Sequence, residues 1–506
     1  MPKEILINME PQEKRVALLE DQLLQEFYVE RMNAAGGSLV GNIYKGRVAS
    51  VVPGIEAAFI DLGLEKNGFL YVSDIVGPGL EYDEEGPPTS DVEERPAASR
   101  RPAPPARTQS IQDLLKKGQE ILVQVVKEPW GTKGVRLTSH ITLPGRTLVL
   151  MPTESHLGIS KKVSDPAERE RIKVILKELN VPQGMGVIIR TAGVGKGKRE
   201  FVRDLQYLLG VWNRVRAMAR KRQAPSLIHE EYDLTVRVIR DLLGDDVDKM
   251  TVDCKDEYRK LQRFVRILAP QLRDRVQLYQ GAVPFFEARG VEAEVQRIYS
   301  PRVELKSGGY IIIEPLESLV AIDVNTGKFT GRKSLEETVS QVNIEAALEI
   351  ARQMRLRDLG GIIIIDFIDM ESHKNQRRVL ETLEDALKRD RAKTNILQLS
   401  QLGLVEMTRQ RIRRSIESLA FRDCPTCHGR GSVKSSLTLS IECQRQIKKA
   451  FGQDGKREVE LTVHPEVASR LFNEDRILMA RLEREHRGRI IVKPDPTLPF
   501  EEIRIQ

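Results

Sequence analysis

A long helix followed by an uninterrupted apolar strand constrains the fold of this chain more than any other feature. Strands are expected at Gly309–Pro315 and Ser318–Asp323, and a helix opens at Ser334 with Glu337 three residues later, the spacing of a capping box. The run IIIID at Ile362–Asp366 follows, and such a strand is expected where both faces of a sheet are buried. The pattern predicts a β–α–β unit. A further helix and strand extend it, at Gln376–Arg389 and Asn395–Leu399.

Short strands interrupted by glycine indicate a second architecture in the first third of the chain. The expected strands are Tyr44–Val52, Ala57–Asp61, Gly68–Tyr71, Glu120–Lys127 and Val135–Leu137. Short, closely spaced strands with glycine at the corners are typical of a compact barrel of the OB type. Residues 77–109 interrupt it with seven of the chain's 25 prolines, acidic residues first and arginines after, and predict a disordered insertion loop.

Three other segments show clear periodicity. Residues 5–30 alternate apolar and polar side chains and predict the strands of a meander. Residues 146–190 predict strand, helix and strand, and residues 198–224 a helix with one broad apolar face. After Cys427 a smaller α/β region is expected.

Length and composition limit the possible classes of protein. At about 100–200 residues per domain, 506 residues predict three or four domains. The hydrophobic fraction of 40% excludes a mostly disordered chain, and no stretch approaches the ~18 apolar residues of a membrane-spanning helix. The first residues lack a signal-peptide pattern, and four cysteines are too few for a disulfide scaffold. We therefore expect a cytoplasmic protein with no membrane span.

Acidic residues end two strands of the β–α–β unit. Asp323 and Asn325 lie at the end of one strand, and Asp366 ends the other. Ligands of α/β sheets bind beyond the carboxyl ends of strands, and two carboxylates there can share Mg²⁺ with phosphate oxygens. Asn325 is placed to orient Asp323 or a phosphate. The alternative is that these aspartates only cap loops, and Asp369 is either a second ligand or the start of a turn.

The sequence CPTCHGRG has the spacing of a zinc knuckle. Its thiols belong to Cys424 and Cys427, and a structural zinc needs four ligands. No second C-x-x-C is present, so we expect two chains to contribute two thiolates each to one Zn²⁺. The alternatives are a redox C-x-x-C, which usually opens a thioredoxin-like helix, and a third ligand in His428.

The glycine-rich segment RTAGVGK offers a site for a phosphate. It resembles a P-loop but lacks the first glycine and the Ser or Thr after Lys196. It still places Arg190, the Thr191 hydroxyl and glycine-rich backbone amides between a strand and a helix, which suits a phosphate monoester. The alternative is a plain glycine-rich turn.

Aromatic and basic residues indicate contacts with nucleic acid. Phe59 and Phe69 lie in barrel strands with Lys45 and Arg47 nearby, the combination of stacking and charge found in single-strand binders. The alternative for either phenylalanine is a place in the core. Two dense basic runs are interpreted as contacts with a phosphate backbone. The alternative for each single residue is a place on a solvated helix face. The first run contains Arg409, Arg411, Arg413, Arg414 and Arg422, and the second contains Arg377, Arg378, Lys388, Arg389, Arg391 and Lys393.

Five ordered motifs, GFLYVSDI, RTAGVGK, AIDVNTG, LRDLGGIIIIDFIDM and CPTCHGRG, resemble the bacterial ribonuclease E/G family across nearly the whole chain. The resemblance implies a Mg²⁺-dependent endoribonuclease that cuts single-stranded, AU-rich RNA and leaves 5′-phosphate products. The roles it implies fall on the following residues: Asp323 and Asp366 for Mg²⁺ and catalysis, Asn325 in support of Asp323, Arg190 and Thr191 for a 5′-monophosphate, Phe59, Phe69, Lys127 and Lys133 for RNA, and Cys424 and Cys427 for Zn²⁺.

The resemblance also implies a domain order. It predicts an RNase H-like region in two segments (1–37 and 235–298), interrupted by an OB-fold RNA-binding barrel (38–139, with the insert 77–109) and a 5′-sensor region (140–234). A DNase I-like catalytic region (299–420), a zinc link (421–432) and a small α/β dimerisation domain (433–506) follow. The insert is longer than expected for that barrel.

The expected partners are rRNA precursors and mRNA, in rRNA maturation and mRNA turnover, and other copies of the chain in a homodimer or homotetramer. The chain ends soon after the small domain, which favours the G-type branch and predicts no degradosome partners. A non-catalytic RNA-binding or ribosome-assembly protein is the alternative, supported by the barrel and the basic runs.

Overall fold

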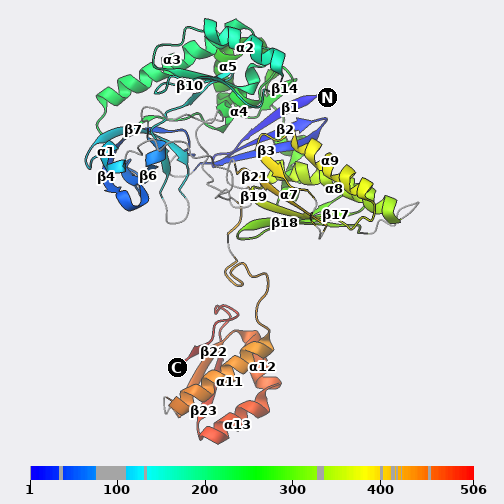
Figure 1. Ribbon diagram of the computed structural model, residues 1–506. Coiled ribbons are helices and arrows are strands. Elements are labelled where there is room, and N and C mark those ends of the chain that lie inside the picture. The colour runs from blue at the N-terminus through cyan, green and yellow to red at the C-terminus, as the bar shows by residue number, and fades with distance from the viewer. Residues whose placement is uncertain are drawn as a thin grey trace. The chain divides into compact units, whose positions relative to one another are not determined.

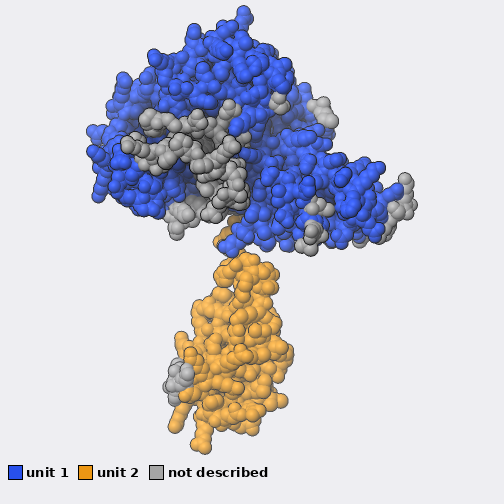
Figure 2. All heavy atoms as spheres, in the orientation of Figure 1, with its two compact units in different colours: residues 1–413 blue, residues 414–506 orange. Residues whose placement is uncertain are grey.

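The computed structural model describes residues 2–32, 38–75, 110–129, 134–163, 165–327, 335–398, 400, 403–411, 416, 420–422, 424–453 and 457–506. It forms two compact units, residues 1–413 and 414–506 (Figure 2). The predicted insert 77–109, the helix cap Ser334 and the expected RNA contact Lys133 lie outside the described residues.

The first sheet of unit 1 joins segments that are far apart in the sequence. Its five strands run in the order β15-β14-β1-β2-β3, and Figure 1 labels β14, β1, β2 and β3. The predicted meander is confirmed as the antiparallel strands β1, β2 and β3, and β14 pairs with β1 in parallel. The bounds are β1 Lys3–Met9, β2 Glu13–Glu20, β3 Leu23–Arg31, β14 Lys249–Val252 and β15 Val276–Leu278. Helices α4 (Leu234–Leu242) and α5 (Lys255–Leu268) share its core.

The predicted barrel is present. Strands β4, β5, β6, β8 and β7 are hydrogen-bonded in that order, and a β4–β7 pairing closes them into a five-stranded barrel of OB-like form. The bounds are β4 Ile43–Val52, β5 Ala57–Asp61, β6 Gly68–Tyr71, β7 Glu120–Lys127 and β8 Arg136–Thr138. Gly46 allows the closure, since a Cβ there would lie 2.4 Å from a methyl of Ile60.

A four-stranded sheet with two helices follows the barrel in sequence. Its order is β11-β12-β10-β9, with bounds β9 Leu143–Pro144, β10 Leu148–Met151, β11 Leu157–Ile159 and β12 Gly186–Ile189. Helices α2 (Pro166–Glu178) and α3 (Lys198–Lys221) bury apolar faces against it, including Phe201 and Trp212 of α3. The chain returns to the barrel through β13 (Ser226–His229), which pairs with β4.

The predicted β–α–β unit is confirmed in a six-stranded sheet of order β16-β17-β18-β19-β21-β20. Strands β18 and β19 are parallel neighbours, joined by the long helix α8. Helices α8 and α9 pack on this sheet (Figure 1). The bounds are β16 Arg302–Glu304, β17 Tyr310–Pro315, β18 Leu319–Asn325, α8 Leu335–Arg357, β19 Gly361–Asp366, α9 His373–Leu387, β20 Thr394–Ile396 and β21 Leu404–Arg409.

The prediction that both faces of the IIIID strand are buried is wrong. Ile363 and Ile365 are fully buried under the helices, whereas Ile362 is 50% exposed and Ile364 is half-buried. The neighbouring strand β18 alternates in the same way, with Val320, Ile322 and Val324 in the core. The described helices therefore cover one face of this sheet and leave the other open.

Unit 2 is the predicted smaller α/β region. A three-stranded sheet of order β23-β22-β24 packs with three helices around an apolar core that includes Cys443. Figure 1 labels the three helices and the strands β22 and β23. The bounds are α11 Ser436–Gln453, β22 Glu458–Val463, α12 Pro465–Asn473, α13 Arg476–His486, β23 Arg489–Pro494 and β24 Arg504–Ile505. None of the helices within the described ranges is long and apolar enough to cross a membrane.

Candidate active site

Two aspartates face each other on the open side of the six-stranded sheet. Asp323 of β18 and Asp366 of β19 are register partners on adjacent parallel strands, whose backbones lie roughly 4.8 Å apart. Both side chains are exposed, and strand alternation places them, with Asn325, opposite the helix-covered face. The structure therefore brings together the three residues that the sequence predicted, and it leaves them accessible to a ligand.

A hydrogen bond orients Asp323, and neighbouring negative charges affect the pKa of Asp366. The Asn325 side-chain amide donates to a carboxylate oxygen of Asp323 at 2.7 Å. Partial burial, and then the negative charges of Asp323 and Asp369, raise the pKa of Asp366 above its ordinary value. Asp369 is thus close enough to act electrostatically on the site. Negative charge accumulates at the strand ends with no cation of the chain bonded to Asp323 or Asp366 among the residues that the structure describes.

A buried asparagine that the sequence reasoning missed holds the loop after β19. Asn343 of α8 is fully buried; its amide donates to the carbonyl of Ile368 at 2.8 Å, and its oxygen accepts from the Ile368 amide at 3.1 Å. Glu336 accepts hydrogen bonds from the backbone amides of Glu371 and Ser372, both at 3.2 Å. These contacts hold the segment that carries Asp369. A polar residue in the otherwise apolar stripe of the helix was the only sequence signal.

The donor set fits a hard divalent cation. Within the described ranges, no three His, Cys, Asp or Glu side chains are grouped to hold a metal ion. Mg²⁺ does not need such a group, because it keeps several waters and takes one or two carboxylates together with phosphate oxygens of its substrate. Two exposed oxygen donors that repel each other's charge satisfy that requirement. Asp323 and Asp366 are therefore the residues that could hold Mg²⁺.

The outward face of the barrel carries an aromatic ladder. Phe59 and Phe69 are register partners whose ring centroids lie 5.3 Å apart, and the Phe69 ring is 4.4 Å from that of Tyr71. The Arg136 guanidinium lies 5.1 Å from the centre of the exposed Tyr71 ring. Both phenylalanines are half-buried and lie outside the barrel core, and Lys127 is exposed opposite Arg136 in the register. Tyr71 and Arg136 were missed, although Tyr71 follows Phe69 at the strand period.

Arg190 and Thr191 lie where the sequence placed them. Arg190 follows β12 directly, and Thr191 opens a short 3₁₀ helix, Thr191–Gly193, before α3. The Arg190 guanidinium donates to the Gly145 carbonyl at 2.6 Å and pairs with Asp241 at 2.7 Å, while Thr191 is exposed. Burial opposes the charge of Asp241, but Arg240 and Arg190 hold its pKa at about 2. Arg190 is therefore fixed in place by a permanent anion.

The C-x-x-C segment of unit 2 forms a turn. Cys424 is exposed and Cys427 half-buried, and the backbone amide of His428 donates to the Cys424 carbonyl at 2.8 Å. Backbone amides of Cys427 and Thr426 donate to the Cys424 sulfur and lower the pKa of its thiol. These features suit a metal-binding thiolate. The cysteines precede the start of α11 at Ser436 and do not open that helix.

One of the two basic runs is only partly available to a polyanion. Arg409 is 4% exposed and pairs with Asp390 at 2.7 Å and Asp358 at 2.9 Å, so its interpretation as a phosphate contact is wrong. Arg409 lies on the core side of β21, where a buried cation needs carboxylate partners. Arg413 and Arg414 lie outside the described residues. Of the second run, Arg377 and Arg378 are exposed on α9.

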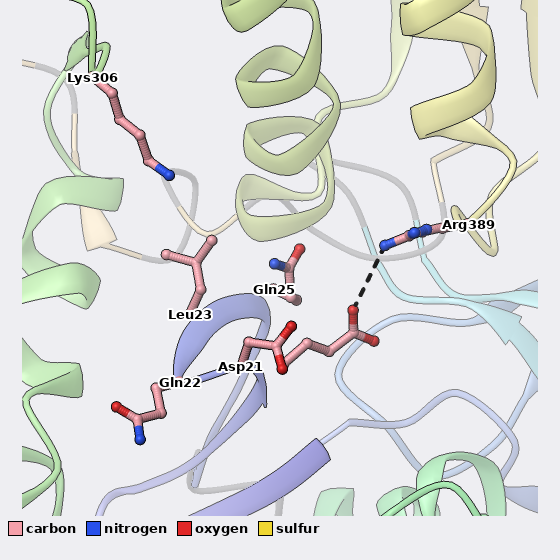
Figure 3. Close-up of a pocket in the computed structure, with 7 residues that line it drawn as sticks. Asp21, Gln22, Leu23, Gln25, Lys306 and Arg389 are labelled. Carbon is pink, nitrogen blue, oxygen red and sulfur yellow. Dashed lines mark ion pairs between the residues drawn. The ribbon is translucent and has the colours of Figure 1, made fainter. Parts of the chain in front are cut away.

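Arg389 of the second run lies at a pocket beside the β2–β3 turn (Figure 3). The exposed Arg389 guanidinium is 4.0 Å from the half-buried Glu20 carboxylate, a long and therefore weak ion pair. The pocket is lined by Glu20, Asp21, Gln22, Leu23, Gln25, Lys306 and Arg389, and so contains none of the other predicted site residues. Arg389 therefore belongs to the junction between the first sheet and the six-stranded sheet.

The barrel has an aromatic outer face, and the six-stranded sheet carries a pair of carboxylates on its open side. Together these features define the class of enzymes that bind and cut nucleic acids. Comparison with known proteins makes this specific. A family model described as the ribonuclease E/G family matches residues 142–412, more than half of the chain, and a model described as the thioredoxin-like domain of RNase E/G matches residues 423–506. The chain belongs to the ribonuclease E/G family.

Relatives support the same assignment over nearly the full length. The chain is 43% identical to Ribonuclease G of Escherichia coli K12 over 485 residues, which covers 96% of this chain and 95% of that protein. It is 43% identical to Ribonuclease G of Haemophilus influenzae over 472 residues, 93% and 92% of the two chains. Ribonuclease E of Haemophilus influenzae is 39% identical over 98% of this chain and 51% of its own length. The chain is an endoribonuclease, and the non-catalytic alternative is set aside.

Proposed function

We propose that this endoribonuclease depends on Mg²⁺, cuts single-stranded AU-rich RNA, is stimulated by a 5′-monophosphate and leaves 5′-phosphate products. Its proposed tasks are rRNA maturation and mRNA turnover in the cytoplasm. The observation that carries the proposal is the register pairing of Asp323 with Asp366 on an open sheet face. Exposed carboxylates at this spacing suit a divalent cation and a phosphodiester together, whereas loop caps would be bonded to backbone amides.

The residues of the site have separable roles. Bound Mg²⁺ would stabilise charge on a phosphodiester and activate water. Asp323 and Asp366 would hold the cation, and the Asn325 amide would keep the Asp323 carboxylate turned toward it through the 2.7 Å hydrogen bond. Asp369 would add negative charge at a distance. The aromatic ladder of the barrel suits the unstacked bases of a single strand, which favours a single-stranded substrate.

Metal removal tests this proposal. A 5′-monophosphorylated single-stranded RNA is expected to be cut internally with Mg²⁺ present, and EDTA should abolish the cleavage while RNA binding survives. The chemistry predicts a 5′-phosphate on the downstream product, which a 5′-phosphate-dependent exonuclease detects. Undiminished cleavage in EDTA would overturn the metal assignment.

The phosphate-sensing role is proposed for Arg190 and Thr191, with the ion pair to Asp241 holding the guanidinium in place. Thr191→Val removes the hydroxyl and leaves the backbone unchanged. Because a hydrogen bond to a charged group contributes about 1.5–3 kcal/mol, cleavage of 5′-monophosphate RNA is expected to slow by about tenfold or more. A 5′-hydroxyl RNA serves as the control and should be cut at an unchanged rate. Equal slowing on both substrates would remove Thr191 from this role.

The remaining proposals concern RNA contacts and assembly. Phe59 and Phe69, with Lys127 and Lys133, would stack on and neutralise RNA along the barrel. Cys424 and Cys427 would share a Zn²⁺ with a second chain in a homodimer or homotetramer. Unit 2 supports an assembly because it exposes large apolar side chains on its three helices, among them Ile477 at 79%. The others are Leu437, Ile441, Phe472 and Leu478.

A further inference from the structure

The C-terminal half of α3 is unusually basic. Between Asp204 and Glu230 the chain contains five basic residues and no acidic residue. The basic residues are Arg214, Arg216, Arg220, Lys221 and Arg222, and the structure places all five on its surface. The opposite side of the helix is buried through Leu208, Val211, Trp212 and Val215. Arg214, Arg216, Arg220 and Lys221 therefore lie on the exposed side of the helix, and Arg222 follows at its C-cap; we call this surface the α3 basic face.

Four of these cations lack carboxylate partners. No carboxylate of a described residue forms an ion pair with Arg214, Arg216, Arg220 or Lys221, and Arg216 donates only to Asn213, at 2.7 Å. By contrast, on other helices of unit 1, Lys173 pairs with Glu170, Arg259 with Asp256 and Arg297 with Glu294. Uncompensated positive charge on one face is the electrostatic footprint of a polyanion site.

The end of α3 rests on the outward side of the barrel. The Lys45 ammonium donates to the Arg222 carbonyl at 3.1 Å, and the Arg47 guanidinium donates to the Ala224 carbonyl at 2.9 Å. In Figure 1, α3 runs above the barrel strands and its chain returns to them. These two bonds tie the α3 basic face to strand β4.

The aromatic ladder lies on the same outward surface. Arg47 of β4 is the register partner of Asp61, and Phe59 precedes Asp61 by two residues on the same side of β5. A path over the barrel surface thus leads from Tyr71, Phe69 and Phe59 past Arg47 to the end of α3. Bases would stack on its first part, and phosphates would meet cations on its second.

We propose that the α3 basic face is a second RNA-binding surface, which holds the sugar–phosphate backbone of the substrate segment that extends past the aromatic ladder. The proposal rests on the RNA-cutting function above and adds an extended footprint to it. Its contacts are with phosphates, so the surface strengthens binding to long RNAs without selecting sequence. A membrane is the less suitable polyanion, because no large apolar side chain is exposed between Leu205 and Ala224, whereas helices that lie on membranes expose such residues.

The test compares RNA lengths in EDTA, so that binding is measured without cleavage. The variant Arg216→Gln, Arg220→Gln, Lys221→Gln removes three charges and keeps good helix formers. For a 5′-monophosphorylated RNA of about 30 nucleotides, we expect Kd to rise at least tenfold at about 0.1 M salt, and the slope of log K against log salt to fall by about 2. An RNA of about 8 nucleotides, within the site size of one OB fold, should bind unchanged.

A matched control removes three charges that have partners. Lys173→Gln, Arg259→Gln, Arg297→Gln changes the net charge equally, and long RNA should bind it as it binds the unaltered protein. If both variants lost the same affinity for long RNA, the effect would come from net charge alone and the proposal would be overturned. An unchanged Kd and salt slope in the α3 variant would also overturn it. Loss of binding to phosphatidylglycerol vesicles but not to RNA would assign the face to a membrane. Absence of cleavage in Mg²⁺ would count against the proposed function alone.

Discussion

Replacing Asp366 by asparagine is expected to lower the cleavage rate of a 5′-monophosphorylated RNA at least about 100-fold, since even partners of metal ligands cost 10–100-fold when removed. The amide keeps the size of the side chain but loses the charge that a divalent cation needs. Asp323→Asn should have the same effect, because the two carboxylates are register partners on neighbouring strands. The measurement is single-turnover cleavage with saturating enzyme, beside RNA binding in EDTA, which should survive.

The melting temperature of the Asp366→Asn variant distinguishes loss of the metal site from loss of the folded structure. The raised pKa of Asp366 means that the folded protein holds the proton of this carboxyl more tightly than the unfolded chain does. Stability is therefore lost as the pH rises through the carboxyl titration, and at neutral pH the ionised Asp366 is unfavourable. Asp366→Asn removes that repulsion and is expected to melt at the same or a higher temperature. An inactive variant with a lowered melting temperature would not support a metal role, and a fully active variant would contradict it.

Replacing both Cys424 and Cys427 by serine is expected to lower the mass of the assembly measured by light scattering. A structural zinc needs four ligands, so two thiolates per chain predict about 0.5 zinc per chain and a metal bridge between two chains. Such sites contribute apparent binding free energies of about 10–16 kcal/mol, enough to decide whether the chains stay together. The unaltered protein should also lose mass when a strong chelator removes its zinc.

Cys254→Ser is the matched control, because Cys254 is a partly exposed thiol outside the C-x-x-C turn. It should leave both the zinc content and the mass unchanged. Cys443 is unsuitable, since it is fully buried in the core of unit 2. An unchanged mass in the double variant would contradict the zinc bridge and leave the exposed apolar side chains of unit 2 as the basis of assembly.

Local patterns predicted most of the elements that carry the site. Short runs interrupted by glycine located β4 to β8, and the long apolar periodicity located α8 between two strands whose ends carry Asp323 and Asp366. The failures have physical causes. Four consecutive isoleucines suggest burial on both sides, but the helices of the described ranges pack against one face of β19, and Ile362 on the other face is 50% exposed. Arg409 belongs to a basic run in sequence and yet points into a cluster of carboxylates.

The sequence by itself determined the family, the strand ends that present the acidic residues and the cysteine turn, because short-range spacing and ordered motifs encode them. Only the tertiary structure decided that β1 pairs with β14, that the acidic pair lies on an uncovered face, and that Asn343 holds the loop carrying Asp369. The same is true of the α3 basic face, whose position beside the aromatic ladder depends on two hydrogen bonds to β4. The physical reason is that burial, register and charge compensation are set by contacts between segments remote in sequence, which no local periodicity records.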